Sequence, residues 1–580
     1  MKSVNRLLIA IVGIIIFSAC QDFISKAPLE GPSAENFFSS EEELVMGVNA
    51  AYNYISPRMA DFPYSMEDNT DIVMSRVTNE YQIFRLGELF TTSDVFEEYW
   101  DRSYQGINRS NVILNNGERA QDDTSPELFN RIMAEARVIR AVNYFELIQK
   151  FGDVPLITET PTLEEAGNIE RTSKSQILEF ILTELDEAAA DLPNEYQGSE
   201  IGRVTKGSAL AIKTRAALYN EMYDVAIDAA EKVMNLGVYS LHPSFSELFS
   251  YEGQYSDEII LADQYLQGER AYGVSVIMGR NTSPGAWSGI NPTQHLVSSF
   301  EATDGLPIDE SPLYDPTNPF VNRDPRLAAT VLQPRVWDGT EESIKTYGTI
   351  FDGREYMSTH DPELIPHESY ILDRNSGEMI ANQDVLHEWR TKSGYNLKKY
   401  VNEEDAGNAS SKNVILYRYA DVLLMYAEAK IESGEIDQTV LDAINRVRAR
   451  AYEVGVGQTG QYPAITTTSQ SELREIIRRE RIAELAFEGL RYEDLKRWGL
   501  MEEVYGQDNI WGRPGNYTEL EPDDIPEIDE NGMVDFSAYA EEENLLFMVT
   551  TGRWDPAYML WPIPQSEIDL NPNLTQNPGY

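Results

Sequence analysis

Three glutamates at helical spacing are the most concentrated set of side chains in the sequence that could carry out catalysis. Glu480, Glu484 and Glu488 recur every four residues and therefore line one face of a helix. Two carboxyl groups about 5 to 10 Å apart can serve as the acid and base of a glycoside hydrolase. Arg478 and Arg481 are interleaved with them, however, and neighbouring guanidinium groups keep carboxyls ionised, whereas a general acid needs a raised pKa. We therefore interpret the block as an ion-pair network and predict that the chain is not an enzyme.

Signals for nucleophilic, phosphate or metal chemistry are weak. The five histidines include no pair at a spacing of three or four, and HExxH, GxSxG and phosphate-cradling glycine motifs are absent from the sequence. Residues 527–538 faintly resemble a calcium loop, but the first position is Glu527 and the twelfth is Ala538, where a bidentate glutamate is needed. We expect neither a cofactor nor a metal site; bound calcium stays open but is not indicated.

The only cysteine in the chain, Cys20, follows a short apolar segment near the N-terminus. Lys2 and Arg6 precede eleven apolar or glycine residues, 7–17, which is about half of what a membrane-spanning helix needs. Ser18 and Ala19 give the narrow approach that a signal peptidase requires. The pattern resembles a lipobox, so we predict a lipoprotein signal peptide at residues 1–19 and a lipid on Cys20; secretion with an incidental cysteine is the alternative.

The composition limits the partners that the chain can bind. It holds 47 lysines and arginines against 96 aspartates and glutamates, so its formal charge is 47 − 96 = −49. A charge of this size repels phosphate backbones and anionic headgroups, which argues against nucleic acid and against electrostatic docking on a membrane. Hydrophobic residues make up 42% of the chain, enough for a large packed core.

Helical periodicity dominates both ends of the chain. Residues 127–150 place apolar side chains three or four apart, which predicts an amphipathic helix. Residues 206–237 and 419–451 each consist of a helix, a short break and a second helix, with small residues where the two helices meet. The breaks are expected near Asn220 and at Ser433-Gly434. Both segments resemble the tetratricopeptide helix pair, although a generic αα-hairpin has a similar pattern. Because such pairs bury only one face alone, we expect further pairs, within 37–150.

The middle of the chain differs. Residues 240–400 are rich in Gly, Pro, Asn, Asp and aromatics and contain few long helical runs. They are too long for a simple connector and predict an irregular lobe lying on a helical scaffold. Four prolines within the last twenty residues predict an extended strap across the surface. The fold class that we predict is therefore mainly α, with tetratricopeptide-like helix pairs as the scaffold.

Several strings taken together resemble the SusD-like (RagB/SusD) family of outer-membrane nutrient-uptake lipoproteins. They begin with the lipobox at Cys20 and run in the family's order to the C-terminus. The strings are YWDRSYQGINRSNVIL (99–114), AEARVIRAVNYFELIQKFGDVPLI (134–157), VTKGSALAIKTRAALY (204–219), DGLP (304–307), NRDPRL (322–327), YRYADVLLMYAEA (417–429), RRERIAELAFEGLRYEDLKRWG (478–499) and WPIPQSEIDLNPNLTQNPGY (561–580).

The resemblance implies a non-catalytic lid over a SusC-like TonB-dependent transporter in the outer membrane. Such a lid captures a nutrient, most often an oligosaccharide and in some members a peptide, and delivers it by closure. It also implies the following organisation: signal peptide 1–19, lipidated tether 20–36, N-terminal helical region 37–239, irregular ligand-binding lobe 240–400, and C-terminal region 401–580. Phe17 replaces the usual leucine of the lipobox, and only one acid, Asp22, follows Cys20 closely, which bears on lipidation and on exposure at the outer face.

Sugar recognition needs exposed aromatic faces together with amides, carboxylates or guanidinium groups. Aromatics on polar loops are therefore better candidates than those in helical stripes. Trp287 lies between two glycines in NTSPGAWSGINP, and Trp337 follows in QPRVWDGT. Trp100 opens a helix, where core packing is the default, but the resemblance implies that this helix start lies near the binding face. The segment before that helix adds further candidates: Asp71, Arg76, Asn79 and Tyr81.

Three functional hypotheses follow. The first is a glycan-capturing lipoprotein, with peptide cargo as its alternative. The second is a secreted glycoside hydrolase, which would release shorter products from a glycan. The third is a pure scaffold that grips a partner peptide in a concave helical groove, in which case Trp287→Ala would leave binding intact.

Overall fold

The computed structural model describes most of the chain from residue 37 onward. The described residues are 37–56, 67, 70–75, 83–266, 268–270, 289–332, 346–348, 355–358, 370–373, 378–381, 391, 393–402, 405, 410–506, 510–514, 524–536, 546–550 and 552–580. Cys20 and the predicted segments 1–19 and 20–36 lie outside them.

The scaffold consists of long helices in both halves of the chain. They are α3 (Glu41–Ala51), α5 (Asp94–Asn116), α6 (Pro126–Phe151), α8 (Lys174–Asp191), α9 (Lys206–Leu218), α10 (Tyr223–Asn235), α16 (Tyr419–Ser433), α17 (Gln438–Ala451) and α18 (Gln470–Leu485). Shorter helices connect or cover them: α4 (Ile83–Leu86), α7 (Leu163–Ala166), α11 (Phe245–Leu248), α13 (Gln294–Ser299), α14 (Pro325–Thr330), α19 (Arg491–Arg497), α20 (Met501–Gly506) and α21 (Gln565–Leu570). Short 3₁₀-helices occur at η1 (Tyr52–Tyr54), η4 (Gly117–Asp123), η5 (Gly198–Glu200) and η10 (Pro556–Met559).

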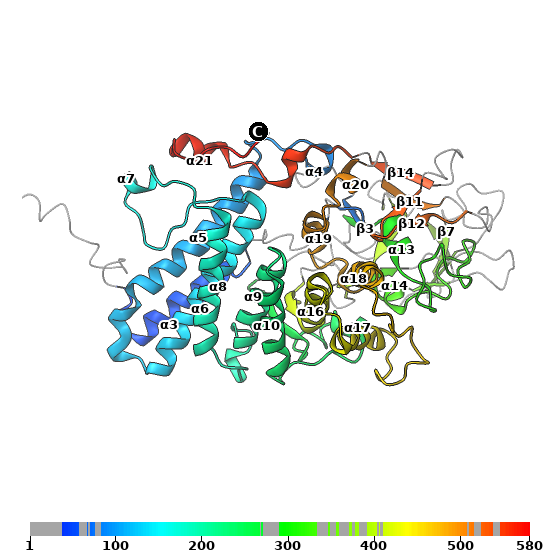
Figure 1. Ribbon diagram of the computed structural model, residues 1–580, viewed down its shortest axis with the longest axis horizontal. Helices are drawn as coiled ribbons and strands as arrows, with labels where there is room; N and C mark the ends of the chain where they lie inside the picture. Colours follow the sequence, from blue (N-terminus) through cyan, green and yellow to red (C-terminus); the bar gives the residue numbers. More distant parts are fainter. Residues whose placement is uncertain are drawn as a thin grey trace, which may run out of the picture.

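The long helices stand side by side in one continuous row (Figure 1). α5 packs on α6, α6 on α8, α8 on α9 and α9 on α10. α10 then contacts α16, which packs on both α17 and α18. The two predicted helix pairs are therefore neighbours in space, and α5 with α6 supplies the further pair expected in the N-terminal region. The mainly α, tetratricopeptide-like fold class is confirmed.

Local side chains fix where these helices begin and end. The Ser125 hydroxyl accepts a hydrogen bond from the Leu128 amide at the start of α6, and Thr205 forms a reciprocal capping box with Ser208 at the start of α9. Gly434 ends α16 in the left-handed conformation, with φ of 79°, where a side chain would be strained. The break predicted at Ser433 and Gly434 is thus the C-cap of α16.

Helix α6 is more deeply buried than a single amphipathic stripe predicts. From Ala134 onward only Arg137 in this helix is more than slightly exposed, because α5 and α8 pack on opposite sides of it. Two of its buried charged residues have partners: Arg140 donates to Glu184, and Glu146 accepts from Tyr99 over 2.6 Å. Its charged residues suggest a surface helix, so the sequence alone does not show that α6 is central and buried.

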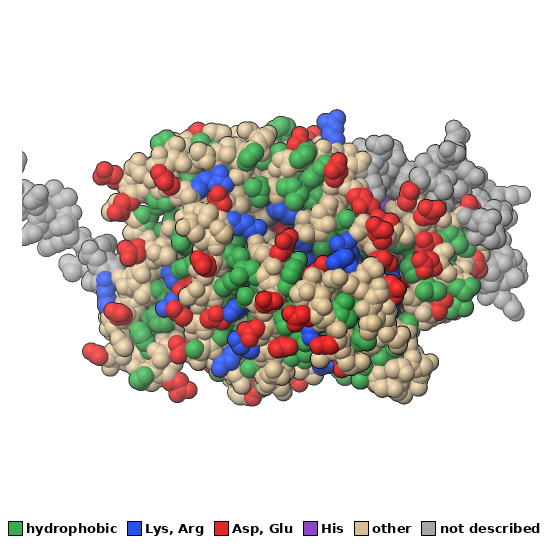
Figure 2. Space-filling model, viewed as in Figure 1, with side chains coloured by type: hydrophobic (Ala, Val, Ile, Leu, Met, Phe, Trp, Pro, Cys, Tyr) green, Lys and Arg blue, Asp and Glu red, His purple; other side chains and the backbone are tan. Residues whose placement is uncertain are grey.

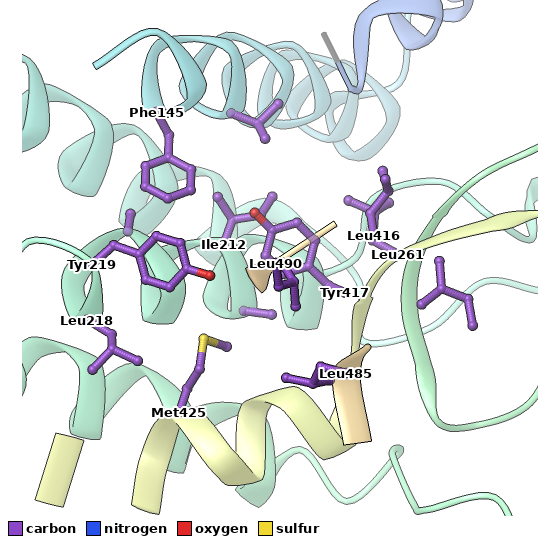
Figure 3. Packing of buried hydrophobic residues seen from close by; sticks show 14 of the residues in the cluster. Phe145, Ile212, Leu218, Tyr219, Leu261, Leu416, Tyr417, Met425, Leu485 and Leu490 are labelled. Carbon is purple, nitrogen blue, oxygen red and sulfur yellow. The ribbon is translucent and has the colours of Figure 1, made fainter. Parts of the chain in front are cut away.

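The hydrophobic core runs through the whole row of helices. Figure 3 shows Phe145 of α6 and Tyr219 of α9 facing each other, with ring centroids 6.0 Å apart, above Met425 of α16. Leu261 and Tyr417, from two strands of the lobe side, reach the same core. A single core therefore joins the N-terminal helices to the C-terminal ones.

Strands are short and lie mainly in the lobe. They are β1 (Val73–Ser75), β2 (Ile259–Asp263), β3 (Ile290–Pro292), β4 (Val331–Leu332), β5 (Thr346–Gly348), β6 (Glu355–Ser358), β7 (Tyr370–Asp373), β8 (Glu378–Ala381), β9 (Asn396–Leu397), β10 (Val414–Arg418), β11 (Ile510–Pro514), β12 (Glu527–Ile528), β13 (Val534–Asp535) and β14 (Leu546–Thr550). The described pairs are antiparallel: β1 with β3, β2 with β10, β4 with β9, β11 with β14, β12 with β13, and the series β5–β6–β7–β8. The lobe thus contains small two-stranded sheets and one four-stranded sheet. The domain boundaries inferred from the sequence stay a prediction.

The last twenty residues cross the ends of α5 and α6, as the predicted strap does (Figure 1). Trp561 is fully buried beneath the strap, with its ring against Phe96, Tyr99 and Phe151. Its indole donates to the Tyr492 hydroxyl over 3.1 Å. The strap is therefore anchored in the core. Within the described residues, no helix combines the length and apolar character needed to cross a membrane.

Candidate functional site

The three spaced glutamates are buried and paired with basic side chains. Glu480 accepts from Arg326 over 2.6 Å, and Glu488 accepts from Lys399 over 2.7 Å. Glu484 is fully buried and contacts Arg326 and Arg418 at 3.0 and 2.6 Å, as well as Arg450. We call this group, together with Glu258, which pairs with Arg418 and Arg450, the buried ion-pair network.

The network explains why these acids are unsuited to acid catalysis. Burial by itself raises the pKa of Glu484, but the charges of Arg450, Arg418 and Arg326 outweigh it and hold that pKa far below its ordinary value. Burial likewise opposes ionisation of Glu488, and Arg418 with Lys399 lowers its pKa overall. The ion-pair interpretation of the block is confirmed.

The partners of these glutamates are not the arginines expected from the sequence. Arg481 pairs with Asp421 and Asp494, and Arg478 donates to Asn531. Arg481 follows Glu480 by one residue and so points about 100° around the helix from it, where Asp421 and Asp494 lie. The charges that hold the three glutamates come instead from α14, β10, α17 and the chain after β9.

Among the predicted ligand contacts, only Asp71 and Trp100 have described side chains. Trp287, Trp337, Tyr81, Arg76 and Asn79 lie outside the described residues. Whether any of these seven side chains contacts a ligand therefore stays a prediction. Asp71 and Trp100 lie in different parts of the molecule and have different surroundings.

Asp71 lies directly before β1 in a buried ion pair. The two carboxylate oxygens accept from Nε and Nη2 of Arg491 over 3.0 and 2.7 Å. Burial disfavours the charged carboxylate, but the Arg491 guanidinium outweighs it and lowers the pKa of Asp71. The Asp71 carbonyl also accepts from the Thr293 hydroxyl, directly after β3. Asp71 thus fastens the β1–β3 pair to the start of α19.

Several buried polar groups around this pair lack partners. Both amide atoms of Asn291, both ring nitrogens of His295 and the Tyr505 hydroxyl have no hydrogen-bond partner in the part of the chain that the structure describes. The same holds for Nε and Nη2 of Arg85 and for Nη1 of Arg491. Burial lowers the pKa of His295 to about 4, so its ring is neutral at pH 7. Because native proteins satisfy nearly all such groups, this polar floor takes partners from outside the described residues, and water or ligand oxygens can supply them.

Strand pairing brings two of the candidate segments to one place. Ser75, the last residue of β1, pairs with Ile290, the first of β3, and the Ser75 hydroxyl donates to the Gly289 carbonyl over 3.4 Å. Arg76 follows Ser75 immediately, and Trp287 precedes Ile290 by three residues. Three residues of extended chain span at most about 10 Å. Segments more than 200 residues apart in sequence therefore meet at this edge.

Trp100 lies elsewhere, in the aromatic core between α5, α6 and the strap. Only 3% of it is exposed, and its ring meets Tyr104 and Phe151 at centroid distances of 5.0 and 5.1 Å. Its edge lines a surface pocket of about 540 Å³ between α5, the chain after α6 and α21.

The faintly calcium-like loop forms the hairpin between β12 and β13, where Asp529 accepts from the Asn531 and Met533 amides. No group of three potential metal ligands occurs among the described residues.

Comparison with known proteins agrees with this architecture. The model of the SusD family matches residues 257–580, which is more than half of the chain. The chain belongs to the SusD family. A second family model, described as starch-binding and associating with the outer membrane, matches residues 23–218.

Similar proteins match most of the length of this chain. A crystal structure of a SusD-like carbohydrate-binding protein from Bacteroides fragilis is 30% identical, covers 93% of this chain and 100% of its own, and gives a TM-score of 0.75. A SusD-like protein of Formosa agariphila is 25% identical, covering 84% of this chain and 89% of its own length. The starch-binding protein SusD of Bacteroides thetaiotaomicron is 25% identical over 78% of this chain and 73% of its own length.

The polar floor has no recognisable signal in the sequence. Arg85, Asn291, His295 and Tyr505 come from α4, β3, α13 and α20, so no spacing along the chain links them. Arg491 stands out in the sequence only as a member of the charged block. The single residue of this site that the sequence marks as a candidate is Asp71, which forms an ion pair with Arg491 of that block.

Proposed function

We propose that this SusD-family chain is a glycan-binding lipoprotein of the outer membrane that carries its lipid on Cys20. It captures an oligosaccharide at the outer face and delivers it to a SusC-like TonB-dependent transporter, without catalysis. Family membership supports this proposal, as do the relatives named for starch and carbohydrate binding. A structural neighbour with 21% identity, named as laminarin-binding, shares the fold.

One structural observation carries the choice of site. The described β1–β3 pair ends one residue before Arg76 and begins three residues after Trp287 in the sequence, and buried polar atoms without a partner among the described residues lie around it. A sugar offers apolar ring faces for an aromatic side chain and hydroxyls that both donate and accept. We therefore propose Trp287 as the central contact, with Arg76, Asn79 and Tyr81 beside it and Asp71 holding the floor in place. Trp337 and Trp100 remain secondary candidates.

Calorimetric titration of residues 21–580 against plant, host and microbial polysaccharides, and against a peptide digest, tests this proposal. We expect one glycan class to bind with Kd between about 1 µM and 1 mM, because a protein that delivers its cargo must also release it. Trp287→Ala should weaken that binding at least about tenfold, which corresponds to about 1.4 kcal/mol. Tyr255→Ala is the matched control, since Tyr255 is 63% exposed and belongs to a different pocket.

The outcomes separate the three hypotheses. Binding only from the peptide digest would assign the protein to peptide uptake. Shorter products appearing from a bound glycan would show a hydrolase. Glycan binding that is unchanged by Trp287→Ala would contradict the proposed site. Binding of a peptide that is unchanged by Trp287→Ala would favour the helical groove of a scaffold.

A further inference from the structure

The pocket beside Trp100 is a second candidate for binding, on a different part of the molecule. In Figure 1, α21 and the start of α5 lie well apart from β3. The pocket has a volume of about 540 Å³, within the usual range for ligand sites. Its wall surface is mostly apolar and comes from three separate segments, and its aliphatic residues include Ile157, Ile169 and Leu570. Leu570 is 73% exposed, the most exposed large apolar side chain in the described part of the chain.

Carboxylates crowd the mouth of this pocket without a basic partner. Asp101 of α5 and Glu567 of α21 both line it, and Glu97 lies one helical turn before Asp101. Burial and the charge of Glu97 raise the pKa of Asp101, and burial together with Asp101 raises the pKa of Glu567. None of the three forms an ion pair with a described lysine or arginine. The nearby arginines of α5, Arg102 and Arg109, lie over the ring of Tyr54 instead.

These features favour a basic side chain as the occupant. An apolar wall with acids at its rim matches the alkyl stem and charged head of arginine or lysine. A sugar fits less well, because only 3% of Trp100 is exposed and its face is covered by Tyr104 and Phe151. The negative charge of the whole chain also attracts a cation and repels an acidic ligand. Acidic side chains are spread over the face shown in Figure 2.

A neighbouring pocket extends the surface along α5. It too measures about 540 Å³, and it shares Gln105 and Asn108 with the first. Its lining is mainly apolar, with Phe37, Met46 and Val112, and also includes Arg109, whose guanidinium lies over the ring of Tyr54. The helix rises about 20 Å between Trp100 and Ile113, which an extended segment of about six residues would cover. The two pockets thus form one groove, acidic at the α21 end and apolar at the α3 end.

We infer that this groove docks a segment of a partner protein that carries an arginine or lysine at one end and apolar residues along the rest. The basic head lies between Asp101 and Glu567, and its stem packs on Leu570. The apolar residues of the segment occupy the pocket between α3 and α5. The inference is independent of which cargo the protein binds, since it uses none of the residues proposed above for glycan contact except the buried edge of Trp100.

Titration of the full chain with short peptides tests it. The probes are two acetylated and amidated seven-residue peptides with leucines at alternate positions and arginine at either end, together with analogues in which citrulline replaces arginine. Citrulline keeps the shape and removes the charge. We expect one arginine peptide to bind and its citrulline analogue to bind at least tenfold more weakly. Raising the salt concentration from 50 to 500 mM should weaken the arginine peptide severalfold.

Isosteric variants assign the effect to the pocket. Asp101→Asn combined with Glu567→Gln should reduce binding of the arginine peptide at least tenfold, while Glu118→Gln, an exposed acid beyond the end of α5, should not change it. An unchanged melting temperature for each variant excludes unfolding as the cause. Equal binding of arginine and citrulline peptides, or no binding of either, would overturn the inference. Preferential binding of a glucosamine oligomer over the peptides would overturn it too, and would make the pocket a cargo site.

Discussion

Replacing Glu484 by glutamine should destabilise the protein strongly, although it changes one oxygen to one nitrogen. Glu484 is fully buried and contacts three arginines, two of them at 2.6 and 3.0 Å. Removing its charge leaves Arg326, Arg418 and Arg450 with too little negative charge around them in a buried site. Breaking a buried ion pair from one side costs about 3–5 kcal/mol, so we expect a loss of that size in the free energy of unfolding.

Glu432→Gln is the matched control, because it makes the same chemical change in a more exposed pair. Glu432 accepts from Nε and Nη2 of Arg474 at 2.8 Å each, and Arg474 is 37% exposed. Exposed pairs contribute at most about 1 kcal/mol. Urea unfolding followed by tryptophan fluorescence gives both free-energy changes from the midpoint shifts. If the two variants lose stability equally, the argument from burial is refuted.

The same variant makes a prediction about pH. Since the pKa of Glu484 is lower in the folded chain than in the unfolded one, its contribution is fully present above the unfolded value of about 4.5. As the pH falls below that value the unfolded chain takes up a proton that the folded chain does not, and the contribution is lost. Glu484→Gln should therefore flatten the dependence of stability on pH between about 5 and 3. A slope equal to that of the wild type would contradict the pKa assignment.

Three further predictions follow from single contacts. Trp561→Ala should lower the free energy of unfolding by about 3–5 kcal/mol, because the ring is fully buried against three aromatics; a loss below about 1 kcal/mol would contradict a core role. Gly106→Ala should lower the melting temperature although alanine has the better helix propensity. The added Cβ would lie 2.7–2.9 Å from the side-chain amide of Asn143, which donates to two carbonyls. A higher melting temperature would show that Asn143 moves aside. Cys20→Ala should abolish incorporation of labelled palmitate into the protein. If the Cys20→Ala protein still incorporates the label, the lipid is attached at another residue.

The sequence revealed the scaffold well because its signals are local. The breaks after Tyr219 and at Gly434 lie where turns do occur, and hairpin periodicity needs only neighbouring residues. The acid block is correctly interpreted as ion-paired, yet its partners differ from those expected, because Arg326 and Arg450 are far from it in sequence. In the sequence, a buried charged residue cannot be told from an exposed one until the structure shows its partner.

The candidate site was less predictable for a related reason. Its described parts come from β1, β3, α13, α19 and α20, and none of these elements has a periodic pattern long enough to read. Asp71 could be suspected from its place in a polar segment, but its pairing with Arg491 depends on a contact across 420 residues. The composition did predict the kind of region in which such a site forms, one rich in turn residues and aromatics.

The buried ion-pair network also restricts how this protein can move. It joins Glu258 before β2, Arg326 of α14 and Lys399 after β9, all in the lobe, to Glu484 and Glu488 at the end of α18 and beyond. Separating the lobe from the helical scaffold would break several of these contacts together. A hinge between the two parts is therefore unfavourable, and we expect the lobe and the helical scaffold to move as one rigid body.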